Sequence, residues 1–234
     1  MDGDAVNPAT GLIAGYNQAE TSAMVEEAHR LGQKVVVHAR GAEGTLYAAR
    51  AGVDVILHAS WMDEEGLEAV VANGCRLCPT LSLVINDIEF TQPTDGCYPG
   101  FPDAHKRELE SALVSMTKAR EAGVPFMLGS DCGFAVTPYG EWNARELEYY
   151  VNYLGFTPAQ ALRCATQVNG QFVRNTGQVG ILEAGRQADI LIVEGDPLAD
   201  ISLLQDKSRI RDVFIAGEPV ALEVNDTIKL VPLE

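Results

Sequence analysis

The chain has 234 residues, 47% of them hydrophobic, and its 33 acidic against 17 basic residues give a formal net charge of −16. This length suits one large domain, or one domain with a smaller companion. The acidic balance argues against nucleic acid or an anionic membrane as partner, because both need a basic footprint. No apolar stretch approaches the roughly 20 residues needed to span a bilayer.

The N-terminus and the cysteines indicate a compartment. Met1-Asp2-Gly3-Asp4 lacks the basic and apolar regions of a signal peptide. Five cysteines, an odd number, are scattered through apolar segments, which is typical of a reducing environment. We therefore expect a cytoplasmic protein. Cys75 and Cys78 have the spacing of a redox or zinc pair, but no second pair completes a zinc site, so we interpret both as buried structural thiols.

Helices and strands alternate in the first third of the chain. Apolar residues at helical spacing predict amphipathic helices, which Gly32, Gly52 and Gly74 would close. Runs of apolar residues between these glycines and the next helix predict buried strands. Short, regular repeats of this kind are typical of parallel strands joined by crossover helices. The predicted order is helix 18–31, strand 34–38, helix 43–51, strand 53–58, helix 63–72 and strand 75–80.

The rest of the chain changes character twice. Residues 91–102 contain three prolines and two glycines and predict a long surface loop, a kind of loop that is more often functional than idle. Thr157-Pro158 is a typical helix start, with an N-cap before proline. Beyond Gly177 the pattern becomes β-rich. The predicted elements are helix 103–122, strand 124–131, helices 143–154 and 158–174, and strands 188–194 and 210–215.

Three of the predicted strands end in residues that bind metals. The first two end in His38 and His58, each followed by a small alanine, and the third ends in Asp131. Metal ligands of a (β/α) barrel come from strand tips. Either histidine alone would more often be an ordinary core or turn histidine. Three strand ends of the same design favour a metal site.

The sequence also resembles a known family. The run from Gly180 to Val193, followed by Gly195-Asp196-Pro197-Leu198, resembles the C-terminal signature of the metal-dependent amidohydrolase superfamily, in its imidazolonepropionase-like and Xaa-Pro dipeptidase-like branch. His38, His58 and Gly129-Ser130-Asp131 match its metal-binding strand ends in order. The segment 143–165, with its Glu-Leu and Thr-Pro-Ala-Gln-Ala-Leu elements, matches as well. The resemblance covers nearly the whole chain.

The resemblance implies an α/β fold of which this chain holds only the C-terminal half. Family members have a barrel of about eight strands, with a His-x-His pair on the first and a lysine, usually carboxylated, on the fourth. This chain has no His-x-His, and its other histidines, His29 and His105, lie in charged helical segments where we expect them to be solvated. We expect residues 1–178 to form about the last four strands of a TIM-type (β/α)8 barrel. We expect residues 179–234 to form a β segment of a composite β-sandwich domain.

A half barrel has consequences for association. Two unpaired strand edges and an uncovered apolar interior should not be stable alone. We expect a homo-oligomer, or a chain that needs a missing N-terminal half.

The resemblance also implies chemistry. His38 and His58 would bind one divalent ion, most naturally zinc. Asp131 would bind a second ion and act as general base and then acid, so that activated water hydrolyses an amide or related C–N bond. A dipeptide, an N-acyl amino acid or a cyclic amide would be the small-molecule substrate. With only these three ligands, a single ion with open positions is what the chain can hold.

Further residues near the strand ends are candidate substrate contacts. They are Arg40, Trp61, Tyr139 and Trp142; Arg40 could pair with a substrate carboxylate. A surface ion pair or aromatic packing is the alternative for each.

Two other functions stay open. The first is a non-catalytic half-barrel or assembly subunit. The second is an α/β hydrolase using Asp131 as nucleophile within Gly129-Ser130-Asp131-Cys132-Gly133, although the residues that follow predict a loop rather than a helix.

Overall fold

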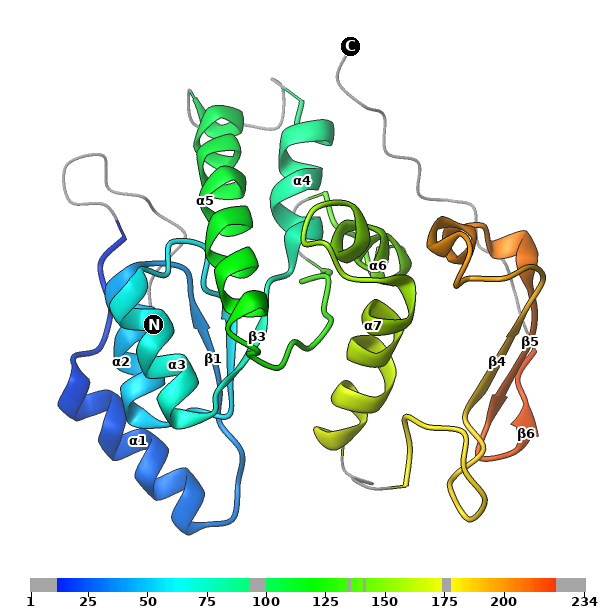
Figure 1. Ribbon diagram of the computed structural model, residues 1–234, viewed down its shortest axis with the longest axis horizontal. Helices are drawn as coiled ribbons and strands as arrows, with labels where there is room; N and C mark the ends of the chain where they lie inside the picture. The colour runs from blue at the N-terminus through cyan, green and yellow to red at the C-terminus, as the bar shows by residue number, and fades with distance from the viewer. Residues whose placement is uncertain (1–11, 93–99, 134–135, 141, 174–177, 222–234) are drawn as a thin grey trace.

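A computed structural model describes residues 12–92, 100–133, 136–140, 142–173 and 178–221. A parallel sheet with its helices occupies the N-terminal part, and a small antiparallel sheet lies at the opposite end of the molecule, beyond α6 and α7 (Figure 1). The α/β fold expected from the sequence is therefore present.

The parallel sheet has the order β1-β2-β3. Its strands are β1 (Val36–Ala39), β2 (Val55–His58) and β3 (Arg76–Cys78). Helices α1 (Gln18–Arg30), α2 (Ala42–Ala51) and α3 (Glu64–Asn73) precede and connect them. On the far side of β3, Phe126 makes a single parallel bridge with Leu77. The predicted strand 124–131 is thus reduced to one bridge, since Pro125 has no N–H to donate to a ladder.

The helix ends lie within two residues of their predicted positions in this part of the chain. Gly52 and Gly74 are left-handed C-caps, with φ of 77° and 67°, a conformation that glycine adopts without strain. Asn17 and Thr157 each form a capping box, which satisfies the free amides of a helix start. Local sequence signals therefore set these boundaries.

Two helical regions differ from the prediction. Helix α4 (Leu81–Phe90) was not expected and leads from β3 toward the loop before α5 (Phe101–Glu121). After α6 (Asn143–Asn152), the predicted helix 158–174 is divided into α7 (Pro158–Arg163), a π turn over 164–168 and a 3-10 turn over 169–171. Asn169 gives a reason for the irregular turns. Its side-chain amide accepts from the Leu128 N–H (3.1 Å) and donates to the Leu128 carbonyl (2.8 Å), which ties the turn to that strand end.

The C-terminal sheet is antiparallel. It consists of β4 (Ile190–Val193), β5 (Ile210–Ile215) and β6 (Glu218–Pro219), with the 3-10 turns η3 (Ile201–Gln205) and η4 (Lys207–Arg209) between the first two strands. This confirms the β-rich character predicted beyond Gly177. Ile201 and Leu203 of η3 are buried, and Gln205 donates to Glu148 of α6 at 2.7 Å, so η3 attaches this sheet to the rest of the molecule.

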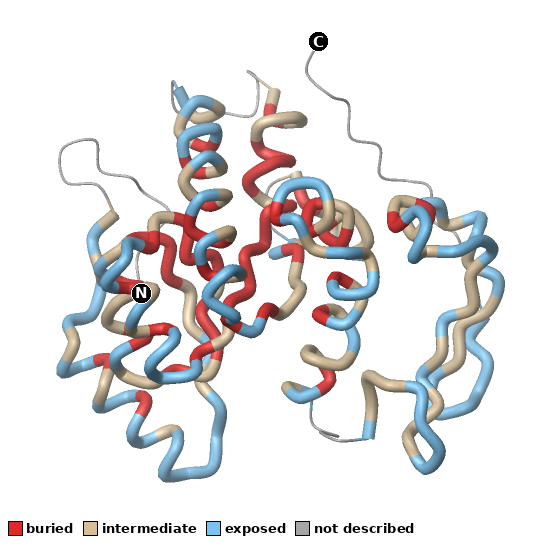
Figure 2. Tube along the Cα trace, in the orientation of Figure 1, coloured by how far each residue is buried: buried red, intermediate tan, exposed pale blue. Residues whose placement is uncertain are grey.

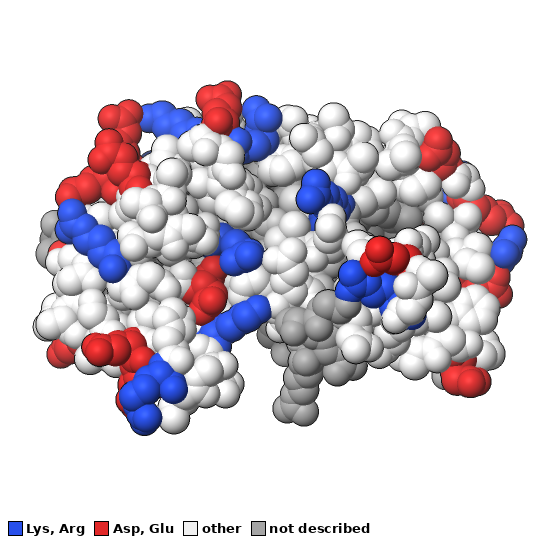
Figure 3. Space-filling model, turned by 60° about the horizontal axis from the view of Figure 1, so that its bottom comes forward, with Lys and Arg blue, Asp and Glu red and all other residues white. Residues whose placement is uncertain are grey.

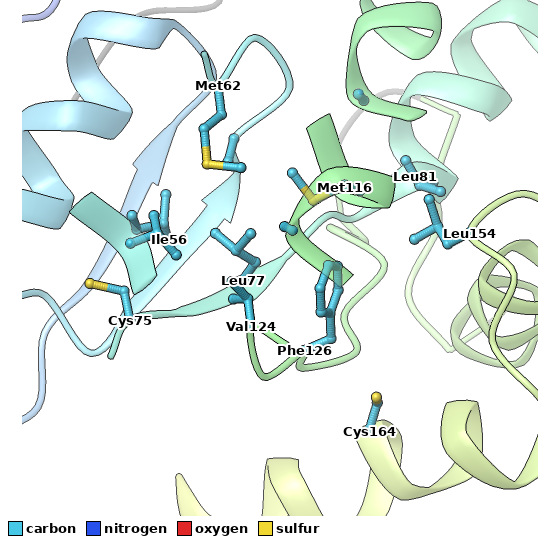
Figure 4. Close-up of a cluster of buried hydrophobic side chains, with 14 of the residues drawn as sticks. Ile56, Met62, Cys75, Leu77, Leu81, Met116, Val124, Phe126, Leu154 and Cys164 are labelled. Atoms are coloured by element: carbon cyan, nitrogen blue, oxygen red, sulfur yellow. The ribbon is translucent and has the colours of Figure 1, made fainter. Parts of the chain in front are cut away.

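The core lies between the parallel strands and their helices. Buried residues concentrate on β2, β3 and the adjoining segments (Figure 2). Ile56, Leu77 and Phe126 meet Met116 of α5 in one cluster (Figure 4). Val36 on the edge strand β1 is 53% exposed, whereas its register partner Val55 on β2 is 1% exposed.

Cys75 and Cys78 are buried free thiols, as predicted, and burial raises the pKa values of both. Cys97 lies outside the described residues.

The face in Figure 3 carries basic side chains scattered among acidic ones. Within the described ranges, every helix is too short or too polar to cross a membrane.

Candidate active site at the strand ends

The three strand-end residues predicted as metal ligands lie next to one another. The imidazole rings of His38 and His58 meet edge to face, with centroids 4.6 Å apart. His58 Nε2 lies 3.9 Å from Asp131 Oδ2. Adjacent parallel strands present their carboxyl ends at one edge of a sheet, and this explains the convergence. Three residues that are far apart in the sequence thus lie together in the structure.

The backbone is strained at this edge. Five non-glycine residues among those described have positive φ, and four lie at or just beyond strand ends of the site: His58 (72°), Ala59 (50°), Thr80 (54°) and Asp131 (53°). Such conformations cost on the order of 1–3 kcal/mol each and cluster at functional sites. The surrounding contacts must therefore hold these residues in place.

His58 is fixed by Thr80. The imidazole is only 4% exposed, and its Nδ1 lies 2.6 Å from the Thr80 hydroxyl. This contact occupies one ring nitrogen and leaves Nε2 on the side of Asp131. The orientation is that of a ligand whose second nitrogen is held by a neighbouring side chain.

Glu146 of α6 is a fully buried acid. Its carboxylate accepts hydrogen bonds from the amides of Leu81 (2.8 Å) and Ser82 (2.7 Å) and from the Ser82 hydroxyl (2.6 Å). These amides open α4, so the acid caps a helix N-terminus from another helix. Burial raises the pKa of Glu146 to about 7, although the hydrogen bonds from Ser82 and Leu81 act in the opposite direction.

A second buried carboxylate holds Arg40. The Arg40 Nε donates to Glu108 Oε1 at 2.8 Å, and a second guanidinium nitrogen bonds the other carboxylate oxygen. Ser60 donates to the same Oε1 at 2.8 Å. Arg40 is 7% and Glu108 1% exposed. This pair therefore joins the ends of β1 and β2 to α5.

The other candidate substrate residues lie in three surroundings. Trp61 lies beside Arg40, whose Cζ is 5.7 Å from its ring centroid. Tyr139 is 78% exposed, and its ring packs against Gly133, where no Cβ would fit. Trp142 packs on Phe90 at 5.5 Å. The structure thus places Arg40 and Trp61 together and Trp142 with α4.

One expectation about the remaining histidines is wrong. His105 is 7% exposed rather than solvated, and its Nε2 lies 3.4 Å from Asp87, itself 1% exposed. A carboxylate on the neighbouring helix explains how a histidine in a charged segment becomes buried. His29 is 42% exposed in its side chain and bonds Asp54 at 3.0 Å.

Sequence reasoning missed the residues that support the site, namely Thr80, Glu146 and Glu108. Glu146 belongs to the Glu-Leu element that matches the family pattern. That match indicated where the residue lies in the family pattern but not what its side chain contacts. Glu108 lies in a helix rich in charges, where nothing separates a buried glutamate from its exposed neighbours. Their contacts become visible only in the folded chain.

The residues fit a divalent metal in kind but form an incomplete site. Two imidazoles and a carboxylate are donors that zinc accepts, and a tetrahedral zinc would place an N and an O donor about 3.4 Å apart, close to the 3.9 Å between His58 and Asp131. In the part of the chain that the structure describes, however, no three His, Cys, Asp or Glu side chains are arranged to hold an ion together. Additional ligands would be needed to complete the site.

Comparison with known proteins gives a consistent result. The model of the amidohydrolase family matches residues 4–220. Ochratoxinase of Aspergillus niger is 30% identical over 210 residues, which are 88% of this chain and 42% of that protein. A Xaa-Pro dipeptidase with bound methionine in the active site shares 30% identity at a TM-score of 0.75, over 88% of this chain and 49% of that one. A prolidase complexed with N-methylphosphonate-L-proline shares 26% identity at a TM-score of 0.76, over 92% and 51% of the two chains.

These matches fix both the family and the extent of the likeness. The chain spans about half the length of these relatives. The family resemblance seen in the sequence is confirmed: this chain belongs to the amidohydrolase family.

Proposed function

We propose that the chain is the C-terminal half of a metal-dependent hydrolase that cleaves an amide or related C–N bond. The observation that carries the proposal is the convergence of His38, His58 and Asp131 at one strained edge of the parallel sheet. Family membership supports the reaction class. It also favours this function over an α/β hydrolase with Asp131 as nucleophile.

In this proposal each residue of the site has a separate task. His38 and His58 hold a divalent ion, for which zinc suits the donor set. When bound, such an ion lowers the pKa of water toward about 7 and polarises a carbonyl. Asp131, whose side chain is 40% exposed, can reach both water and substrate. It accepts the proton of the attacking water and passes it to the leaving amine, as base and then acid.

We propose a dipeptide or an N-acyl amino acid as substrate, with a cyclic amide as the other class. The similarity to a Xaa-Pro dipeptidase and a prolidase supports the first class. Arg40 and Trp61 lie at the same strand ends as the histidines and remain the proposed substrate contacts, with Tyr139 and Trp142 farther along the chain. In the structure the carboxylate that Arg40 binds is Glu108, so a substrate carboxylate would have to share this guanidinium.

We also propose that residues 1–178 are half of a TIM-type barrel and that 179–234 belong to a composite β-sandwich domain. The order β1-β2-β3 and the bridge at Phe126 support a run of four consecutive parallel barrel segments. Among the described residues β1 pairs only with β2, and Val36 on its open side is 53% exposed. The partner is then a second copy or a chain that supplies the N-terminal half.

Light scattering tests the association. We expect species larger than a monomer, because β1 pairs with β2 alone among the described residues and an open strand edge favours pairing with another chain. A stable, monodisperse monomer would contradict the half-barrel proposal.

Hydrolysis tests the function itself. The purified chain, supplied with zinc, is assayed with Xaa-Pro dipeptides and N-acyl amino acids, with and without a chelator. We expect cleavage that the chelator abolishes and that Asp131→Asn and His58→Ala each reduce by at least about 100-fold. His29→Ala is the matched control, because His29 bonds Asp54 away from the site, and it should leave the rate unchanged. A rate that His58→Ala leaves intact would disprove the assignment, and no cleavage by any variant would favour a non-catalytic subunit.

A further inference from the structure

We propose that Thr80 and Glu146 are positioning residues for His58: Thr80 sets which ring nitrogen of His58 faces the metal, and Glu146 holds Thr80 in place through the first amides of α4. This inference rests on the proposed function in one respect, namely that His58 supplies a ligand nitrogen. Neither residue touches the reacting atoms in this assignment.

The first step is the contact between His58 and Thr80. Nδ1 and Oγ1 are 2.6 Å apart, and both residues are 4% exposed, so this hydrogen bond does not exchange readily with water. Nε2 is left facing Asp131 at 3.9 Å. A neutral imidazole binds a metal through its unprotonated nitrogen. Nε2 can therefore serve as ligand only if the hydrogen is on Nδ1 and is donated to the Thr80 hydroxyl.

The second step is the conformation of Thr80. Its φ of 54° and ψ of 48° lie in the left-handed region, which is a strained place for a β-branched residue. Contacts on the adjoining residues must offset this strain.

The third step is the carboxylate of Glu146. The residue that follows Thr80 begins α4, and the amides of Leu81 and Ser82 both donate to Glu146 at 2.8 and 2.7 Å. The Ser82 hydroxyl adds a third bond at 2.6 Å. Because Glu146 is wholly buried on α6, water cannot take its place as the acceptor for these three donors. Glu146 thus fixes the start of α4, and through it the left-handed Thr80.

Four variants separate this role from general stability. Thr80→Ser keeps the hydroxyl, whereas Thr80→Val keeps the shape and loses the acceptor. Glu146→Gln keeps the size and loses the charge. Glu148→Gln is its matched control, because Glu148 lies on the same helix and bonds Asn152 and Gln205 instead. Circular dichroism and thermal unfolding of each variant show whether it folds.

The first readout is the tautomer of His58, from nitrogen NMR of the histidine-labelled chain at about pH 8, where imidazole is neutral. The chain has 4 histidines, and His58→Gln assigns the signal. We expect the hydrogen on Nδ1 in the wild type, Thr80→Ser and Glu148→Gln, and a mixture of tautomers in Thr80→Val and Glu146→Gln. Hydrogen on Nε2 in the wild type, or the same spectrum in folded Thr80→Val, would overturn the inference.

The second readout is cobalt binding followed by visible absorption. We expect Thr80→Val and Glu146→Gln to weaken the Kd about 10-fold or more and the other two variants to leave it unchanged. Equal affinity in all folded variants would contradict the positioning role. If the wild type binds no cobalt while the tautomer results hold, the proposed metal site fails and the role of Thr80 and Glu146 in orienting His58 stands.

Discussion

Carboxylates cap helical turns in two regions of this molecule, in opposite surroundings. In the C-terminal part, Asp200 and Asp206 accept from the amides of Ser202 and Ser208 in water, and the hydrogen bonds from these serines lower their pKa values. At the strand ends Glu146 makes the same kind of bonds while fully buried, and its pKa is raised. A turn at the surface can be capped by an acid that stays in water. The buried acid Glu146 instead lies next to a strand end where the backbone of Thr80 is strained.

The largest effect should come from a second buried acid, Glu108. Glu108→Ala leaves the guanidinium of Arg40 buried without its carboxylate, and breaking a buried ion pair in this way costs about 3–5 kcal/mol. Urea unfolding followed by circular dichroism measures the loss. Glu65→Ala is the matched control, because its partner Arg50 is 48% exposed, and it should cost about 1 kcal/mol or less. Equal losses in the two variants would remove the distinction between the regions.

Glu146 should give the chain a pH dependence of its own. Its pKa is about 7 in the folded state against an ordinary 4.5, so between these values the folded chain binds more protons than the unfolded one. The free energy of unfolding therefore falls as the pH rises from about 5 to about 7, by on the order of 3 kcal/mol from this residue. Glu146→Gln should remove that slope in urea titrations at several pH values. Parallel curves for the wild type and Glu146→Gln would contradict the burial.

The exposed capping residues should affect stability least, and their effect should change with pH in the direction opposite to that of Glu146. The lowered pKa of Asp200 means that its contribution is present above the unfolded pKa and is lost as the pH falls through the folded one. Asp200→Asn should therefore change thermal unfolding only slightly at neutral pH, and less still under acid. A loss as large as that of Glu108→Ala would show that the C-terminal turns are under similar constraint.

The sequence predicts the parts of this molecule that local chemistry decides. Glycine at the ends of α2 and α3 and the capping boxes at Asn17 and Thr157 are short-range signals, and they place helices within two residues. The closeness of His38, His58 and Asp131 was also predictable, because side chains that follow successive parallel strands lie at one edge of the sheet.

The supporting residues could not be predicted, because their partners are far apart in the chain. Helix α4 begins at a left-handed Thr80 with no side-chain cap of its own; its capping group is Glu146, on another helix. Arg40 and Glu108 likewise meet only after α5 packs over the sheet. His105 is buried for the same kind of reason, through Asp87 on α4. Tertiary packing determines these contacts, and no local sequence pattern predicts them.

Zinc binding to the purified chain tests the central claim most directly. Isothermal titration at neutral pH compares the wild type with His58→Ala and, as control, His29→Ala. The metal site predicts about one ion per chain for the wild type and for His29→Ala, and a loss of at least about 10-fold in affinity for His58→Ala. Identical binding by all three chains, or none by the folded wild type, would contradict it.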